Sequence, residues 1–269
     1  LMVDQPIIMG VLNITPDSFS DGGLFLEAQS AIDQAILMVE QGADIIDIGG
    51  ESTRPGAPEV SAEDELKRVL PVIEALSGNI DVPISIDTSK PGVMERAFGA
   101  GASIINDVYA LRSKGALEMA ASLGADVCLM HMQGNPRTMQ KNPKYDDVVS
   151  DVKIFFTERL EACSAVGIKL ESITLDPGFG FGKNLAHNIA LLKNLAEFHD
   201  FGVSILAGLS RKSMIGSLLG DKEVDSRMIG SVTAALIAVE NGANIIRAHD
   251  VAETKDALTV WQQIKHFRE

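Results

Sequence analysis

A short pattern of small, polar and apolar residues recurs along the chain and predicts its fold. Each copy reads Gly-Ala, one polar residue and two apolar residues, and follows a segment with apolar residues at three- and four-residue spacing. The copies are residues 42–46, 101–105, 124–128 and 242–246. The glycine suits the left-handed position after a helix, and the apolar run suits a strand buried on both faces. The repeat therefore predicts helix–strand units of a parallel sheet.

Four further apolar runs, at residues 7–12, 83–86, 173–175 and 203–207, complete a set of eight strands. Each strand is followed by a helical pattern, as at residues 31–41 and 228–241. Eight alternating units in 269 residues predict the α/β class and a single (β/α)₈ TIM-barrel domain over residues 1–269. An open doubly wound sheet is the alternative, but residues 13–16 lack the glycine fingerprint usual after its first strand.

Two connections after strands, one following the first strand and one following the second, are longer than usual. The first runs from Asn13 to about Glu27 and the second from Gly49 to about Ala62. Long loops in compact domains are often lids or binding loops. Phe19 is a large apolar residue on the first of them, and it either packs back on the barrel or stacks on a ligand.

Polar residues lie at the same end of all eight predicted strands. A barrel brings these ends round one mouth, where active sites lie. Taken singly, each residue reads more readily as a helix cap or turn former. Their convergence predicts a functional site. In chain order they are Asn13, Glu51 to Arg54, Asp87, Asn106 with Asp107, His131, Asp176, Ser210 to Ser213, and Arg247 with His249.

The residue types at this mouth indicate two kinds of ligand group. Carboxylates and an amide that donate and accept in one plane suit a flat heterocycle with amino and ring N–H groups. Those residues are Asp87, Asn106 and Asp176. Asn13, Arg247 and His249 come from the first and last strands, which are neighbours in a closed barrel, and suit an anion with or without a metal. The segment around Lys212 opens a helix, whose free N–H groups can hold a further anion.

Composition narrows the function classes. Hydrophobic residues make up 46% and charged residues 22%, which excludes bulk disorder. With 23 Lys plus Arg against 37 Asp plus Glu, the net charge is −14, which disfavours nucleic-acid binding. Two cysteines exclude a disulfide framework and fit a reducing compartment. No apolar run approaches about 18 residues and no signal peptide is evident, so we expect a cytoplasmic protein with no membrane span.

Other catalytic motifs fit poorly. Residues 178–183 resemble a phosphate loop, but Pro177 and Asn184 break the Walker pattern, and Lys183 stands where a dinucleotide fingerprint has its third glycine. This segment is better interpreted as a mobile or tight loop. No histidine pair with zinc-ligand spacing and no Gly-x-Ser-x-Gly elbow is present, which argues against zinc and α/β hydrolases.

Motifs from the first strand to the last resemble the dihydropteroate synthase family. The two longest and most specific are Met9 to Gly23 and Gly42 to Gly56. Shorter matches are residues 86–88, 105–107, 130–134, 175–181, 208–213 and 247–250. The resemblance covers essentially the whole chain, with no departure at a position that the family uses.

The resemblance implies a reaction in folate biosynthesis. 6-Hydroxymethyl-7,8-dihydropterin diphosphate would condense with 4-aminobenzoate, with Mg²⁺ as cofactor, to give 7,8-dihydropteroate and diphosphate. The C–O bond would break before the amine attacks, and Asp87, Asp176 and Lys212 are the catalytic residues implied. It also implies sulfonamides as inhibitors, and a homodimer formed through helices on the far side of the barrel.

The resemblance further assigns residues to each part of the substrates. Arg54 and Asp21 would close the loops over diphosphate and metal, and Asn13 would also ligate Mg²⁺. The implied pterin-binding residues are Asp87, Asn106, Met130, Asp176, Gly208 and Lys212. The implied diphosphate-binding residues are Asn13, Arg54, Arg247 and His249. The implied aminobenzoate-binding residues are Phe19, Thr53, Pro55 and Ser213.

Two other functions remain to be weighed. A methyltetrahydrofolate:corrinoid methyltransferase would share the pterin-binding acids, but should lack both the diphosphate group of Asn13, Arg247 and His249 and the loop of residues 53–56. A non-catalytic pterin-binding paralogue would bind pterin tightly without turnover.

Overall fold

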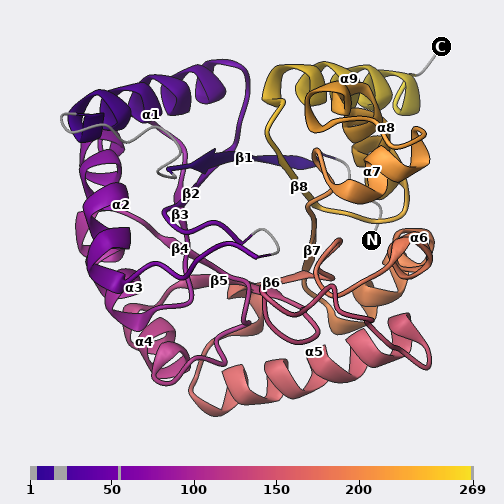
Figure 1. Ribbon diagram of the computed structural model, residues 1–269, viewed down its shortest axis with the longest axis horizontal. Coiled ribbons are helices and arrows are strands. Elements are labelled where there is room, and N and C mark those ends of the chain that lie inside the picture. The colour runs from indigo at the N-terminus through magenta and orange to yellow at the C-terminus, as the bar shows by residue number, and fades with distance from the viewer. Residues whose placement is uncertain (1–4, 15–22, 54–55, 268–269) are drawn as a thin grey trace.

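The computed structural model describes residues 5–14, 23–53 and 56–267, and for residues 23–27 the backbone alone. Within these residues eight strands close into one barrel in sequence order, and each strand is parallel to both neighbours (Figure 1). The predicted (β/α)₈ barrel is confirmed. The strands are β1 (Ile7–Asn13), β2 (Ile45–Gly49), β3 (Ile84–Asp87), β4 (Ile104–Asp107), β5 (Asp126–Met130), β6 (Ile173–Asp176), β7 (Ser204–Ala207) and β8 (Ile245–Ala248).

Helices surround the barrel in Figure 1. The described helices are α1 (Gly23–Glu40), α2 (Ala62–Leu76), α3 (Pro91–Ala100), α4 (Ala116–Leu123), α5 (Val148–Ala165), α6 (Leu185–Lys193), α7 (Ser213–Leu218), α8 (Met228–Glu240) and α9 (Val251–Lys265). Three short 3₁₀ turns are η1 (Leu170–Ser172), η2 (Leu195–Phe201) and η3 (Val224–Ser226). Of the helices the structure describes, none has the length and apolar character needed to cross a membrane.

The repeated glycine ends a helix in all four copies, as the sequence predicts. Gly42, Gly101, Gly124 and Gly242 have φ of +98°, +122°, +61° and +107°, a region that other residues rarely adopt. At Gly101 space is short as well, because a Cβ atom there would lie 2.2 Å from Oγ of Ser77. Each glycine thus reverses the chain from its helix into the next strand.

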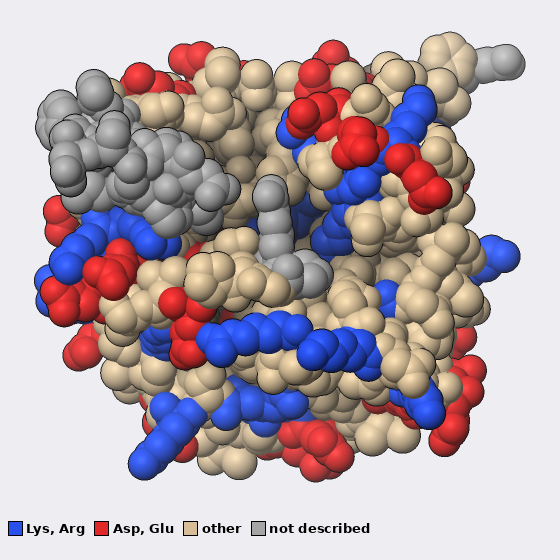
Figure 2. Space-filling model, viewed as in Figure 1, with Lys and Arg blue, Asp and Glu red and all other residues tan. Residues whose placement is uncertain are grey.

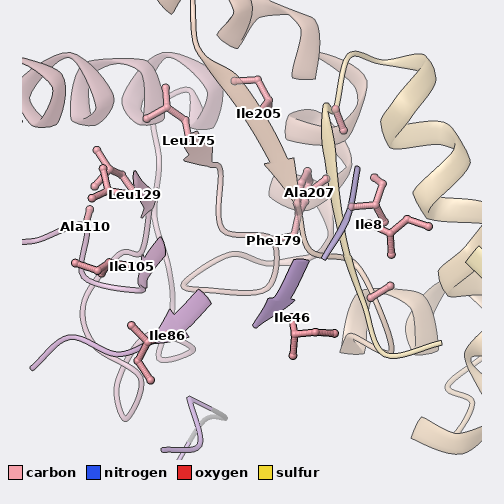
Figure 3. Packing of buried hydrophobic residues seen from close by; sticks show 14 of the residues in the cluster. Ile8, Ile46, Ile86, Ile105, Ala110, Leu129, Leu175, Phe179, Ile205 and Ala207 are labelled. Carbon is pink, nitrogen blue, oxygen red and sulfur yellow. The ribbon is translucent and has the colours of Figure 1, made fainter. Parts of the chain in front are cut away.

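Alternate side chains of the strands serve two different cores. One set faces the helices, and Figure 3 shows part of it, including Ile46, Ile86 and Leu175. The other set fills the barrel: Ile45 and Ile245 pack with residues of β1, β5 and β7, which can meet only across the interior. Because side chains alternate along a strand, the residues two places further on also face inward. The fold thereby aims the strand ends into the mouth of the barrel.

The second long connection is as predicted, since α2 begins at Ala62. The first connection ends earlier than the expected boundary at about Glu27, because α1 already begins at Gly23. The residues that follow Gly23 are Leu, Phe, Leu and Glu, which a helix accepts well, so the glycine pair before them marks the end of the loop. Residues 15–22 of this connection lie outside the described residues.

Candidate active site

The carboxyl ends of the strands bring the predicted pterin-binding residues together at one end of the barrel. Asp87 on β3 is in register with Asn106 on β4, and Met130 on β5 is in register with Asp176 on β6. Figure 2 shows a hollow near the centre of the face drawn in Figure 1, with Lys and Arg atoms on its wall. This is the mouth at which the sequence predicts a functional site.

Arg247 lies at the centre of the site, on β8. Its Nε donates to Oδ2 of Asp47 at 2.6 Å, and its Nη2 donates to Oδ2 of Asp87 at 2.9 Å. Burial lowers the pKa of Arg247, but the two carboxylates outweigh this effect and hold the pKa above its ordinary value. Arg247 is therefore a fixed cation, and it contacts a carboxylate of the predicted pterin-binding set.

Asp47 is a site residue to which the sequence analysis assigned no role. It is completely buried on β2, and its Oδ2 also accepts a hydrogen bond from Nδ2 of Asn106 at 3.0 Å. Its Oδ1 has no hydrogen-bond partner among the described residues. The sequence carries one signal for this role, which is a charged residue within the apolar run Ile-Ile-Asp-Ile. Asp47 stands two residues before the end of the strand at Gly49, and hence on the inward face.

The surroundings of Asp87 raise the pKa of its carboxyl group. Burial and the negative charge of Asp47 raise its pKa to about 8, although Arg247 acts in the opposite direction. The alternative interpretation of Asp87 as a helix cap is wrong, because α3 begins at Pro91 and the residue before that helix is Lys90. Asp87 instead belongs to a cluster of two carboxylates around one guanidinium.

Asp176 and Lys212 are a second set of opposite charges that influence each other. Asp176 is buried, its Oδ1 accepts from the backbone N–H of Gly178 at 2.7 Å, and burial raises its pKa against the opposing charge of Lys212. Nζ of Lys212 donates to the carbonyl of Phe179 and lies 4.5 Å from the ring centre of Phe181. Burial lowers the pKa of Lys212 to about 8, and Asp176 limits that shift. For Asp176 the turn-forming interpretation is correct, and its carboxylate also faces a cation.

An apolar wall and a small gap complete this part of the site. Met130 is buried in a cluster with Val108, Met132, Met139, Tyr109 and Phe181. At Gly208 a Cβ atom would lie 3.8 Å from Cβ of Arg247 and 4.0 Å from Nζ of Lys212. The glycine therefore leaves space between two cations, as a flat ligand requires.

The predicted diphosphate-binding residues lie on the two strands that close the barrel. Asn13 ends β1 and is exposed. His249 follows β8 and is half-buried, and its Nδ1 lies 3.0 Å from Oγ of Ser210. Ser210 also accepts from the backbone N–H of His249 at 3.2 Å, so the loop after β7 fixes this ring. Arg54, the remaining predicted residue, lies outside the described residues.

The predicted aminobenzoate-binding residues are less completely described. Thr53, Asp87 and Tyr109 line one hollow of about 600 Å³. Ser213 is exposed and is the first residue of α7, with Lys212 before it. Phe19 and Pro55 lie outside the described residues, as does Asp21.

The loop after β2 is fastened by an ion cluster beside this hollow. Nζ of Lys90 donates to Glu51 and, at 2.5 Å, to Oε2 of Glu65, which is completely buried. Oε1 of Glu51 accepts from the backbone N–H of Val60 at 3.1 Å. Lys90 thus ties both ends of the loop that carries Thr53 to the helices below.

For a metal ion, the described residues contain no group of three or more His, Cys, Asp or Glu side chains that could hold one. The sequence predicts Asn13 as a metal ligand. Asn13 is exposed, and it offers one amide oxygen.

Comparison with known proteins identifies the family. The pterin binding enzyme family matches residues 9–249. A dihydropteroate synthase of Escherichia coli (strain K12) is 56% identical over 262 residues, 97% of this chain and 92% of the relative. The Yersinia pestis dihydropteroate synthase, solved in a sulfonamide drug complex, has a TM-score of 0.93 and 52% identity over 99% of this chain and 97% of that one.

A third relative is the Xanthomonas albilineans dihydropteroate synthase in complex with 7,8-dihydropteroate. It has a TM-score of 0.88 and 44% identity, and covers 100% of this chain and 96% of that one. These similarities extend over the whole barrel and over every strand end described above. The chain belongs to the dihydropteroate synthase family of pterin-binding enzymes.

Proposed function

We propose that the mouth of the barrel divides the two substrates of the dihydropteroate synthase reaction between its two groups of residues. The chain is a transferase that forms a C–N bond in folate synthesis. It condenses 6-hydroxymethyl-7,8-dihydropterin diphosphate with 4-aminobenzoate, giving 7,8-dihydropteroate and diphosphate. The observation that carries the assignment of residues is the fixed cluster of Asp47, Asp87 and Asn106 around Arg247.

The pterin would lie over this cluster. Asp87 and Asp176 offer carboxylate oxygens to its amino and ring N–H groups, and Asn106 offers an amide that both donates and accepts. Met130 would contact one face of the ring, and Gly208 would leave it room beside Lys212. Because Arg247 is already paired with two carboxylates, it would form a rigid floor for the ring.

The chemistry would rest on charge stabilisation. Breaking the C–O bond leaves a cationic methylene on the pterin, which Asp87 and Asp176 stabilise in their ionised forms. The negative charge that develops on the leaving diphosphate is met by Arg247 and His249. The amine of 4-aminobenzoate then attacks the methylene carbon and loses a proton, and it needs no covalent enzyme intermediate. Holding both substrates together supplies much of the remaining acceleration.

The donor set at the mouth fits a Mg²⁺ ion. Asn13 provides an amide oxygen, and Mg²⁺ is usually held by one or two protein oxygens together with phosphate oxygens. When bound, the ion supplies positive charge for the leaving diphosphate. We propose that Arg54 contributes to the same diphosphate.

The 4-aminobenzoate would lie beside the pterin, against the loop after β2. Thr53, which lines the same hollow as Asp87, supports this position. We propose that Phe19 and Pro55 flank its ring and that Ser213 binds its carboxylate. The Yersinia pestis relative was solved with a sulfonamide drug. We propose that sulfonamides inhibit this chain by competing with 4-aminobenzoate.

We also propose that the chain forms a homodimer and works in the cytoplasm. Large apolar side chains are exposed on α7, α8 and the segment between them, and Ile229 is 76% exposed. We propose that these exposed apolar side chains form the contact between the two copies. Light scattering of the wild type and of Ile229→Glu tests the dimer, which the glutamate should weaken. The free, buried Cys128 and Cys163 fit a reducing compartment.

The test of the function is diphosphate release from a mixture of the protein, the pterin diphosphate, Mg²⁺ and 4-aminobenzoate. We expect release only when all components are present, with dihydropteroate formed in equal amount. Binding of the pterin diphosphate without release would instead indicate a non-catalytic paralogue. If neither binding nor release occurs, the assignment is wrong and methyl transfer from methyltetrahydrofolate is the next assay.

A further inference from the structure

Lys183, in the loop between β6 and α6, has a buried amino group that the proposed reaction does not use, and burial holds its pKa well below the ordinary value. Lys183 is only 3% exposed, and no carboxylate among the described residues forms an ion pair with it. Nζ instead lies within hydrogen-bond distance of four acceptors. They are Nδ1 of His131 at 2.9 Å and the carbonyls of Gly178 at 3.0 Å, Phe181 at 3.0 Å and His131 at 3.3 Å.

All four neighbours can act as acceptors. Burial and the charges of Lys183 and Arg112 lower the pKa of His131 to about 2, so its ring stays neutral. With its proton on Nε2, Nδ1 is free to accept from Lys183. Burying an amino group, charged or neutral, is costly unless its N–H donors are used. Here they are used entirely on the loop and on the strand end beside it.

The loop is tight, because side chains bind each of its five successive carbonyls from residue 178 to residue 182. This arrangement agrees with the tight-loop interpretation of the sequence. The donors are Lys183 to Gly178 and Phe181, Lys212 to Phe179, Gln140 to Gly180 at 2.5 Å and Tyr145 to Gly182 at 2.8 Å.

The start of the loop packs closely against the end of β5. Gly178 has φ of +71°, and a Cβ atom there would lie 1.9 Å from the carbonyl oxygen of His131. That same carbonyl accepts from Lys183. The lysine therefore fixes the distance between the loop and the end of β5 at the point where Met130 and Asp176 are in register.

Both ends of this arrangement act on the proposed pterin site. The N–H of Gly178 donates to Asp176, and the ring of Phe181 lies under Nζ of Lys212. We propose that Lys183 is a positioning residue, which sets the Asp176 carboxylate and the Lys212 ammonium by holding Gly178 and Phe181. This inference rests on the proposed function, since it concerns the same pterin site.

The test replaces Lys183 with methionine, which has a similar length and no N–H donors. Isothermal titration with 6-hydroxymethyl-7,8-dihydropterin diphosphate gives both Kd and the number of binding sites per chain. The matched control is Tyr145→Phe, which removes one hydrogen bond from the same loop at Gly182, away from Asp176 and Lys212.

For Lys183→Met we expect about one site per chain and a Kd raised at least about tenfold, since small misplacements of binding groups are costly. Tyr145→Phe should keep the wild-type Kd. A merely structural role would lower the number of sites and leave the Kd of the remaining sites unchanged, which would overturn the proposal. An unchanged Kd with a full number of sites would overturn it as well.

A second variant covers failure to fold. If circular dichroism shows that Lys183→Met is unfolded, Lys183→Gln, which keeps two N–H donors on a shorter side chain, must show a raised Kd at full site number. Wild-type protein that neither binds nor turns over the pterin diphosphate would count against the proposed function. If the wild type binds and turns over the substrate and the Lys183 variant binds it with the same Kd, only the positioning role is wrong.

Discussion

The Nε atom of Arg247 lies 2.6 Å from Oδ2 of Asp47, a completely buried carboxylate two strands away round the barrel. Arg247 cannot turn towards a ligand without leaving that carboxylate unpaired, and an unpaired buried charge is strongly destabilising. The pair thus fixes the height of the guanidinium in the mouth. The position of Asp87, which shares the same guanidinium, follows from it.

Replacing Asp47 by asparagine should lower kcat/KM for the pterin diphosphate. The side chain keeps its shape but loses the charge that holds Arg247. Losing one partner of such a pair costs about 2–5 kcal/mol, so we expect a decrease of at least roughly 30-fold. Steady-state kinetics measure it. Asp126→Asn, at an exposed carboxylate that begins β5, is the control and should leave kcat/KM unchanged. Turnover within twofold of wild type in Asp47→Asn would contradict the prediction.

Replacing Asp87 by asparagine should abolish turnover and leave the protein folded. The amide cannot ionise, so it cannot supply the negative charge that Asp87, whose pKa is about 8, carries in its ionised form, while its size suits the same space. Diphosphate release and circular dichroism measure the two effects. Near-normal release would show that the charge of Asp87 is not needed.

The same variant should change the pH dependence of stability. The pKa of Asp87 is raised from 3.8 to about 8 in the folded protein, so the folded state holds a proton that the unfolded state has released. Its contribution is complete below about pH 4 and is lost as the pH rises through 8. Urea unfolding at pH 5 and pH 8 should show a larger loss for wild type than for Asp87→Asn. Equal losses would contradict the shift.

Lys212 should set the alkaline limit of activity. Its pKa is lowered to about 8, so it is charged below this pH and neutral above it. We expect kcat/KM for the pterin diphosphate to fall above about pH 8. Arginine keeps its charge at such pH, so Lys212→Arg should lose the alkaline decline, whatever its level at neutral pH. Lys222→Arg, at an exposed position, should keep the wild-type profile.

Removing Lys90 should destabilise the fold. Glu65 is completely buried, its Oε1 has no partner among the described residues, and Lys90 is the cation on its Oε2. Leaving that carboxylate alone costs about 3–5 kcal/mol of unfolding free energy. Urea unfolding of Lys90→Met at pH 7 measures the loss.

Two further variants control this measurement. Adding Glu65→Gln to Lys90→Met should recover much of the stability, because no buried charge then remains. Lys67→Met, which removes an exposed lysine of α2 paired with exposed Glu63, should have little effect. If Lys90→Met and Lys67→Met behave alike, the buried pair does not contribute as described.

The barrel could be predicted because its signals are local. Each repeated glycine combines a helix end with the start of an apolar strand, and the left-handed φ of Gly42 and Gly242 confirms this interpretation. The start of α1 was placed too late, because a glycine pair indicates a loop more strongly than it indicates where the loop ends. The polar residues just past the strands were also local signals, and Asp87, Asn106 and Asp176 do lie at one mouth.

Pairings between distant segments could not be predicted in this way. Asp47 is 200 residues from Arg247 in the chain. It lies in a run of isoleucines, where its charge is unusual for a buried strand but does not indicate its partner. Which face of that strand turns inward depends on the register with its neighbours. Lys183 resembled part of a failed phosphate loop, because its partner His131 is 52 residues away on another strand.

The hydrogen bond between Val60 and Glu51 has a consequence for how this chain can change over evolutionary time. It joins Glu51 to Val60, so the two ends of the loop after β2 meet and close a ring, which Lys90 anchors through Glu51. Closing a loop costs little more free energy when the loop is lengthened by a few residues. Insertions or exchanges within the ring therefore leave β2 and α2 undisturbed. The loop can therefore diversify while the barrel beneath it stays the same.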